Sequence, residues 1–271
     1  MTWRALIALA AAILTASCAP PVLKLPSPSG APAADGGDVL TRALATCRAI
    51  RTITAEVAVS GRVNGQRIRA RLQVGLAQPA SAYIEAPAPF GAPIFIFAAE
   101  NDDATLLLPR DRRVLERGRP AEVLEAIAGV PLAPAGLRET LTGCIVDGEA
   151  RTNAAAPDSH WRVFPGDEEL YVHRDRDEDA WRLVAVQHHT PGAVWRAEYR
   201  DFANDLPRSI QLISTPASRF DLRLALSNVE LNVALGPETF RVQIPPGTAP
   251  MTIEELRNAG PLADRSKKTN D

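Results

Sequence analysis

The strongest constraint on the fold is a pair of alternating apolar and polar runs that meet at Asn64-Gly65. In the upstream run, one set of alternate positions holds Val57, Val59, Gly61 and Val63, and the positions between hold Glu56, Ala58, Ser60 and Arg62. In the downstream run, one set holds Ile68, Ala70, Leu72 and Val74, and the other holds Arg67, Arg69, Arg71 and Gln73. A period of two indicates strands, and Asn-Gly favours a tight hairpin turn. The sequence therefore predicts a long β-hairpin with one apolar face. The arginine stripe is most simply its solvated face, and anion binding is the alternative.

Further short strands follow at regular intervals, separated by Pro, Gly, Asn and Asp turns. They are predicted at 82–86, 94–99, 104–108, 114–116, 161–164, 170–173, 182–188, 194–202, 209–214 and 221–233. Helices are predicted at 39–47, 120–128, 134–142 and 253–258. The fold class is mainly β with a few helices (α+β), in which roughly ten or eleven antiparallel strands curl into a half-open barrel.

The helices are expected to plug the concave face of this barrel. They are few and rich in alanine, so a large aliphatic cavity of the kind that holds acyl chains can remain beside them. Aliphatic side chains that fill the interior completely are the alternative. The sequence leaves both open.

The chain begins with a segment typical of export. Met1–Arg4 carries one positive charge, Ala5–Leu14 is apolar over ten residues, and small residues lead to Cys18. This is too short to span a hydrocarbon core of roughly 30 Å, so residues 1–17 are predicted to be a cleaved signal peptide. The pattern resembles the bacterial lipobox, with Thr15 where leucine is usual, and predicts that Cys18 is lipidated. An ordinary signal peptide with an incidental cysteine is the alternative.

Residues 19–37 are rich in Pro, Gly, Ala and Ser and contain few large apolar groups. Such a stretch has little to bury, so residues 18–37 are predicted to be a lipid-anchored flexible tether. Asp38 is a candidate N-cap, which places the folded domain at 38–260 and a polar tail at 261–271. Because Ala19 rather than aspartate follows the cysteine, we expect anchoring in the outer membrane, facing the periplasm.

Lipidation of Cys18 leaves two of the three cysteines, Cys47 and Cys144. An even number in an oxidising compartment, each near the predicted end of a helix, predicts a disulfide between them. Closing a loop of roughly a hundred residues is worth about 3–5 kcal/mol in the chain-entropy treatment. Two buried free thiols are the alternative.

Charge and motifs argue against two classes of function. The formal net charge is −2 and no basic run is interleaved with aromatics, so nucleic acid is not expected as a partner. The histidines lack metal-ligand spacing, and the adjacent His188 and His189 point to opposite faces of a predicted strand. The run Asp175–Asp179 lacks the glycine and terminal glutamate of a calcium loop and is predicted to be a hairpin turn. Without a nucleophile elbow, phosphate loop or dinucleotide fingerprint, we predict a non-enzyme with no catalytic residues, metal or cofactor.

The order of these elements resembles the LolA/LolB group of bacterial outer-membrane lipoprotein-sorting proteins, on the LolB side because of the lipobox. The matching pieces are the opening strand 58–63, the segment 86–91, the helical insert 126–132 with its sequel 137–143, and two closing strands at 229–232 and 240–245. The resemblance implies a hydrophobic cavity that accepts the acyl chains of lipoproteins or lipids and releases them into the outer membrane. A periplasmic carrier protein is then a candidate partner.

The same resemblance assigns a role to Phe90, which stands between Pro89 and Gly91. LolB-like proteins engage the bilayer with an apolar residue on a protruding loop beside such a Pro/Gly pair. A ring on a proline-framed turn loses little entropy when it enters an interface. The alternative for Phe90 is a core residue folded back on the sheet.

The alternative for the whole protein is a structural or assembly lipoprotein with a packed core, docked on another envelope protein.

Overall fold

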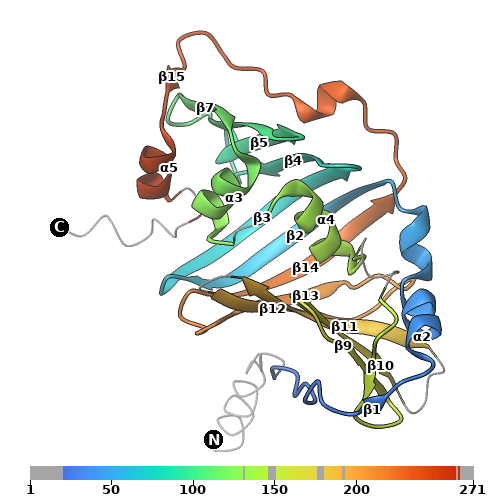
Figure 1. Ribbon diagram of the computed structural model, residues 1–271. Coiled ribbons are helices and arrows are strands. Elements are labelled where there is room, and N and C mark those ends of the chain that lie inside the picture. Colours follow the sequence, from blue (N-terminus) through green and yellow to red (C-terminus); the bar gives the residue numbers. More distant parts are fainter. Residues whose placement is uncertain are drawn as a thin grey trace, which may run out of the picture.

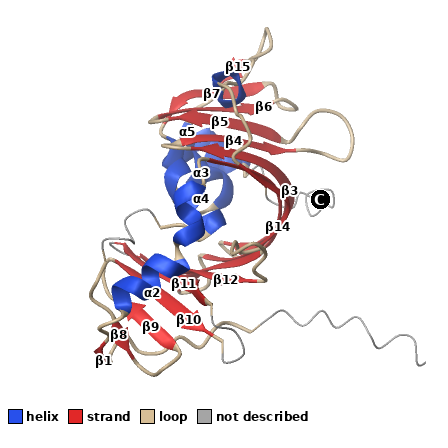
Figure 2. Cartoon of the chain, turned by 90° about the vertical axis from the view of Figure 1, so that its right-hand side faces the viewer, coloured by secondary structure: helices blue, strands red, loops and turns tan. Residues whose placement is uncertain are grey.

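The computed structural model describes residues 21–130, 132–145, 151–175, 180–190, 193–260 and 262. In this part of the chain one sheet of fifteen strands curls around an apolar interior, and helices lie in its concavity (Figures 1 and 2). None of the helices found there is long and apolar enough to cross a membrane. The predicted class, a curled and mainly antiparallel sheet with a few helices, is confirmed.

The strands lie across the sheet in the order β1-β8-β9-β10-β11-β12-β13-β14-β2-β3-β4-β5-β6-β7-β15, antiparallel except for β15 beside β7. Their bounds are β1 (Ala31–Pro32), β2 (Thr52–Val63), β3 (Gln66–Ala77), β4 (Ser81–Ala86), β5 (Phe95–Glu100), β6 (Asp103–Leu108), β7 (Arg113–Gly118), β8 (Ala155–Ala156), β9 (Trp161–Phe164), β10 (Glu168–Arg174), β11 (Trp181–Thr190), β12 (Ala193–Arg200), β13 (Ser209–Thr215), β14 (Phe220–Leu231) and β15 (Ala249–Pro250). The strands β1, β8 and β15 have two residues each, too few to be seen as periodicity in the sequence.

The hairpin predicted at Asn64-Gly65 is present as β2 and β3. Val63 pairs with Gln66, and the two turn residues have φ angles of 49° and 78°, as the Asn-Gly signature requires. Alternate residues of both strands are buried, whereas Arg67, Arg69 and Arg71 are exposed on the outer face. The free side of β2 pairs with β14 from the far end of the chain. This pairing joins strands β2 to β7 with strands β8 to β14, which we call the two arms of the sheet.

Two helices fill the concavity with the predicted bounds. They are α3 (Pro120–Ala128) and α4 (Pro134–Thr142), and each begins at a proline because the first turn of a helix does not need that N–H. Figure 2 shows both helices inside the curl of the sheet. The other helical segments within the described ranges are α2 (Gly36–Ala43), η2 (Ala45–Ala49), η4 (Pro237–Phe240) and α5 (Ile253–Ala259).

The second closing strand expected from the resemblance, at 240–245, is wrong. Phe240 is the last residue of η4, and 241–245 belong to no strand. η4 packs against β4 and β5, where Phe240 is buried, so this segment covers the sheet instead of extending it. Pro245 and Pro246 also lack the N–H groups that a ladder needs.

The flexible tether predicted for 18–37 is also wrong for the part that the structure describes. Residues 21–35, which we call the N-terminal strap, run from the outer face of the sheet, where Leu25 lies, to the edge of the sheet, where β1 pairs with β8. The Asp35 carboxylate accepts two hydrogen bonds from Arg162, at 2.7 and 2.8 Å, and Leu25 packs against Val163 and Tyr171. Few apolar groups are enough here, because charged partners on distant strands hold the segment.

Candidate functional site

The concave face of the sheet is one continuous apolar surface. Inward-facing side chains of both arms join those of α2, α3 and α4 in a single buried cluster. Its largest fully buried members are Phe95, Phe97, Phe164 and Phe220. The helices α3 and α4 cover this face (Figure 2).

The described side chains of the interior pack against one another. A pocket of about 210 Å³ lies at the edge of the core between α2, η2 and β11, and its lining includes Arg42, Thr46, Trp181 and Phe202. Sites for drug-sized ligands usually measure roughly 300–1,000 Å³, so this pocket is too small for a long acyl chain. Across the described residues, the buried side chains of the concave face contact one another.

A hydrogen-bonded carboxylate and imidazole lie on the concave face beside this apolar surface. Glu168 and His188 face each other on β10 and β11, with 3.1 Å between Oε1 and Nδ1, and the His188 ring stacks on Trp195 at 3.9 Å. The hydrogen bond from His188 holds the pKa of Glu168 below its usual value. His189 instead contacts Glu169, at 3.6 Å, so the two adjacent histidines serve different carboxylates. No three His, Cys, Asp or Glu side chains within the described ranges gather as a metal site.

Phe90 stands out from the loop between β4 and β5, with 90% of its surface exposed. Arg110, from the turn between β6 and β7, donates through Nε to the carbonyl of Ala92 (2.9 Å) and through Nη2 to the carbonyl of Phe90 (3.0 Å). These bonds hold the loop backbone while the ring stays in solvent. The alternative in which Phe90 folds back onto the core is therefore excluded.

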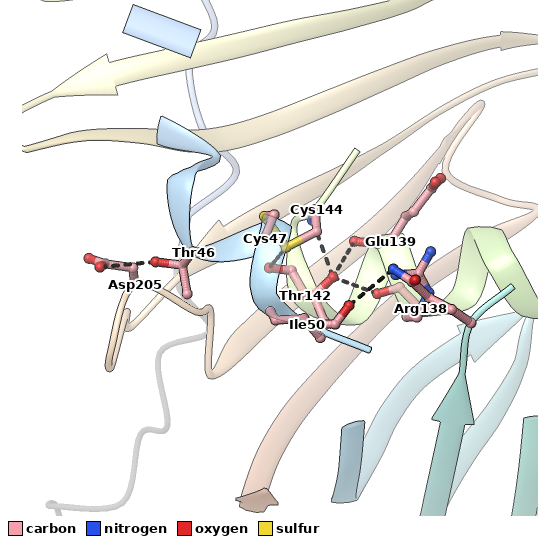
Figure 3. The surroundings of a disulfide bond; sticks show 9 residues. Thr46, Cys47, Ile50, Arg138, Glu139, Thr142, Cys144 and Asp205 are labelled. Atoms are coloured by element: carbon pink, nitrogen blue, oxygen red, sulfur yellow. Dashed lines mark hydrogen bonds between the residues drawn. A yellow bond between two sulfur atoms is a disulfide. The ribbon is translucent and has the colours of Figure 1, made fainter. Parts of the chain in front are cut away.

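Cys47 and Cys144 form a disulfide, with their Cα atoms 5.3 Å apart (Figure 3). The bond joins η2 to the residues that follow α4, and Cys144 is buried against Ile50. Thr142 supports this corner, because its hydroxyl donates to the carbonyl of Arg138 (2.8 Å) and accepts from the backbone N–H of Cys144 (3.2 Å). The predicted pairing of the two cysteines is present in the structure.

Sequence reasoning missed Glu198, a fully buried carboxylate on the outer face of β12. It accepts the backbone N–H of Leu23 (3.0 Å to Oε2) and lies 2.8 Å from Arg196 Nη2 and 2.9 Å from Arg200 Nη2. Arg200 also donates to the carbonyl of Pro21. Residues two apart on a strand share a face, so Arg196, Glu198 and Arg200 place one negative charge between two positive charges. That spacing in the sequence could have revealed the cluster.

Some predicted features lie outside the described residues. These are Cys18 with the signal peptide, residues 176–179 of the acidic turn, and the polar tail apart from Leu262. The disulfide lies beside the concave face, because Cys47 packs against the apolar cluster and lines the pocket, whereas Phe90 is exposed on a loop and does not line that pocket.

Solved structures similar to this chain include a LolA superfamily protein from Nitrosomonas europaea, 13% identical with a TM-score of 0.47 over 76% of this chain and 97% of that one. A domain assigned to outer membrane lipoprotein sorting, from Vibrio parahaemolyticus, is 13% identical with a TM-score of 0.45 over 76% and 96%. A DUF1329 family protein from Desulfovibrio piger is 10% identical with a TM-score of 0.46 over 76% and 95%. No family model matches the sequence, and no curated protein is significantly similar to it. At these identities the likeness concerns the curled sheet and does not identify what this chain binds.

Proposed function

We propose that this protein is an outer-membrane lipoprotein, anchored through Cys18 and facing the periplasm, that binds acyl chains on its concave face. It would receive lipoproteins or lipids from a periplasmic carrier protein and assist their insertion into the outer membrane. The observation that carries the proposal is the continuous apolar concave face, covered by the two short helices α3 and α4. Transfer of apolar surface supplies the driving force, at about 0.8 kcal/mol per buried CH₂.

Because the described interior is packed, an acyl chain has to replace helix contacts with its own. Burying a chain of about sixteen carbons is worth on the order of 10 kcal/mol. Withdrawing Val123, Leu124 and Ile127, the buried side chains of α3, costs roughly 5–9 kcal/mol at 1.5–3 kcal/mol each. The two amounts are of similar size, so the exchange is reversible, as a protein that both accepts and releases lipid requires.

Phe90 supports the delivery step of this proposal. Its exposed ring can enter the bilayer interface without unfolding anything, because Arg110 already fixes the loop backbone. Burial of the ring adds about 2–3 kcal/mol to membrane attachment. The function proposed is binding and transfer without catalysis, metal or cofactor.

The binding step is tested with protein that starts at residue 19, which retains every contact described from residue 21 onward. We expect it to carry lipid detected by mass spectrometry after purification, and to bind a fluorescent fatty-acid probe that added fatty acid displaces. Protein that does neither would contradict the acyl-binding function.

The membrane step is tested separately by Phe90→Glu, with Ile244→Glu as the matched control at another exposed apolar residue, 38% exposed. We expect Phe90→Glu to bind the probe normally but to transfer it to vesicles more slowly, while Ile244→Glu transfers it at the normal rate. Equal rates for all three proteins would remove Phe90 from the mechanism and leave the binding step intact.

A second candidate function is favoured by the packed interior. In this case the protein is a structural or assembly lipoprotein that docks on an envelope partner and takes up no lipid. Failure of both lipid measurements, in a protein with normal circular dichroism, would select this candidate.

A further inference from the structure

The convex face of the sheet carries a group of arginines that the proposed function does not use. We call them the convex arginine patch: Arg62, Arg67, Arg69, Arg71 and Arg223. Arg62 and Arg67 are directly opposite each other in the ladder, and Arg69 and Arg223 flank the same residue, Ser60. In the described part of the chain, Arg62, Arg67, Arg69 and Arg71 have neither an ion-pair partner nor a side-chain hydrogen bond. The Nε of Arg223 is likewise without a hydrogen-bond partner.

This arrangement is unfavourable for the isolated domain. Like charges directly opposite each other destabilise a sheet, as Arg62 and Arg67 do here. One carboxylate lies beside the patch, because Asp221 is opposite Arg62 in the ladder, but it accepts a hydrogen bond from Gln211 (2.9 Å) and forms no ion pair with a described arginine of the patch, while Glu56 lies opposite Gln73. Arg62, Arg67, Arg69 and Arg71 are exposed on this outer surface, and Arg223 is half-buried beside them. A surface of this kind suits an extended array of anions.

The N-terminal strap places the proposed anchor on the same face. Glu198, which holds Leu23, is opposite Gln211, and Gln211 is opposite Arg223. Neighbouring strands are about 4.8 Å apart, so the backbone of Glu198, whose carboxylate holds the strap, lies about 10 Å from the backbone of Arg223. Cys18 precedes Pro21 by three residues, which span at most about 10 Å. Acyl chains on Cys18 would therefore bring this side of the sheet to the level of lipid headgroups.

We propose that the convex arginine patch binds the anionic phospholipid headgroups of the membrane that holds the anchor. This inference rests on the proposed lipidation of Cys18, and it does not depend on acyl binding inside the sheet. Each arginine near an anionic surface strengthens binding about fivefold, and salt screens the attraction. The patch would fix which side of the domain faces the bilayer.

The test uses protein that starts at residue 19, so that acyl chains cannot contribute, and measures cosedimentation with vesicles. One set of vesicles contains equal parts of phosphatidylglycerol and phosphatidylcholine, and the other contains phosphatidylcholine alone. The variant R67Q/R69Q/R71Q is compared with R112Q/R117Q/R241Q, which removes the same charge from exposed residues outside the patch. Circular dichroism checks that both variants are folded.

We expect the wild-type protein to prefer the phosphatidylglycerol vesicles, with a preference that falls as salt rises. R67Q/R69Q/R71Q should lose on the order of a hundredfold in partition coefficient, whereas the control variant should lose little. Absence of a preference in the wild-type protein, or equal losses in both variants, would overturn the inference. Loss of fatty-acid probe binding with an unchanged vesicle preference would instead reject the proposed function and leave this inference standing.

Discussion

Glu198 allows a sharp test of the strap, because this one carboxylate joins Leu23 to two arginines of β12. Replacing Glu198 with Ala removes a charged acceptor from the Leu23 N–H. A hydrogen bond to a charged group contributes about 1.5–3 kcal/mol, so the equilibrium constant for strap opening should rise about 10- to 150-fold. Glu198→Gln keeps one neutral acceptor and should give an intermediate effect.

Hydrogen–deuterium exchange measured by mass spectrometry reports this opening directly. Residues 22–25 carry four backbone amides between Pro21 and Pro26, and the amide of Leu23 is protected by Glu198. We expect exchange there to accelerate by the factor above, while the amides of β11 and β12 exchange at their normal rates because their ladder is intact. Glu56→Ala, at a carboxylate on the outer face of β2, is the control and should change nothing. Unchanged exchange at 22–25 in Glu198→Ala would refute the idea that this carboxylate holds the strap.

Three further predictions concern the domain itself. Replacing both Cys47 and Cys144 with Ala should lower the free energy of unfolding by about 2–5 kcal/mol, because the bond closes a loop with a sequence separation of 97. Urea denaturation measures this change, and an unchanged midpoint would contradict the contribution of the disulfide to stability. Arg138→Met should raise the melting temperature, since the Arg138 side chain is 5% exposed, burial lowers its pKa, and its Nε lacks a hydrogen-bond partner. The hydrogen bond from His188 keeps the pKa of Glu168 below its usual 4.5, so this stabilisation is present above about pH 4.5 and is lost as pH falls through the lowered pKa. Urea midpoints should therefore fall less steeply with acid in Glu168→Gln than in the wild-type protein, and parallel curves would argue against the pair.

Local signals explain why most elements could be predicted from the sequence. Asn64-Gly65 fixes the register of its hairpin, and first-turn prolines mark the starts of α3 and α4. These patterns act over a few residues and do not depend on what lies across the sheet. The exposed position of Phe90 also agrees with its proline-framed turn, although the supporting bonds from Arg110 could not be foreseen.

The strap could not be predicted, because its determinants are distant in sequence. Leu23 and Glu198 are 175 residues apart, and Asp35 and Arg162 are 127 apart. A segment rich in proline and small residues has the composition of a linker, and only the opposing partners show that it is bound. The filling of the concave face is equally non-local, since it depends on how side chains from many strands pack against α3 and α4.

The disulfide at the end of α4 restricts how lipid could enter. Cys144 is tied to η2, so the disulfide fixes the chain just after the C-terminal end of α4, whereas only non-covalent packing holds the helix near Pro134. A helix of nine residues is about 13 Å long, and a swing of about 30° would carry the Pro134 end roughly 7 Å. The oxidised protein would thus open at the Pro134 end of α4, while reduction would release the other end as well. The redox state of Cys47 and Cys144 would then determine which end of α4 is held.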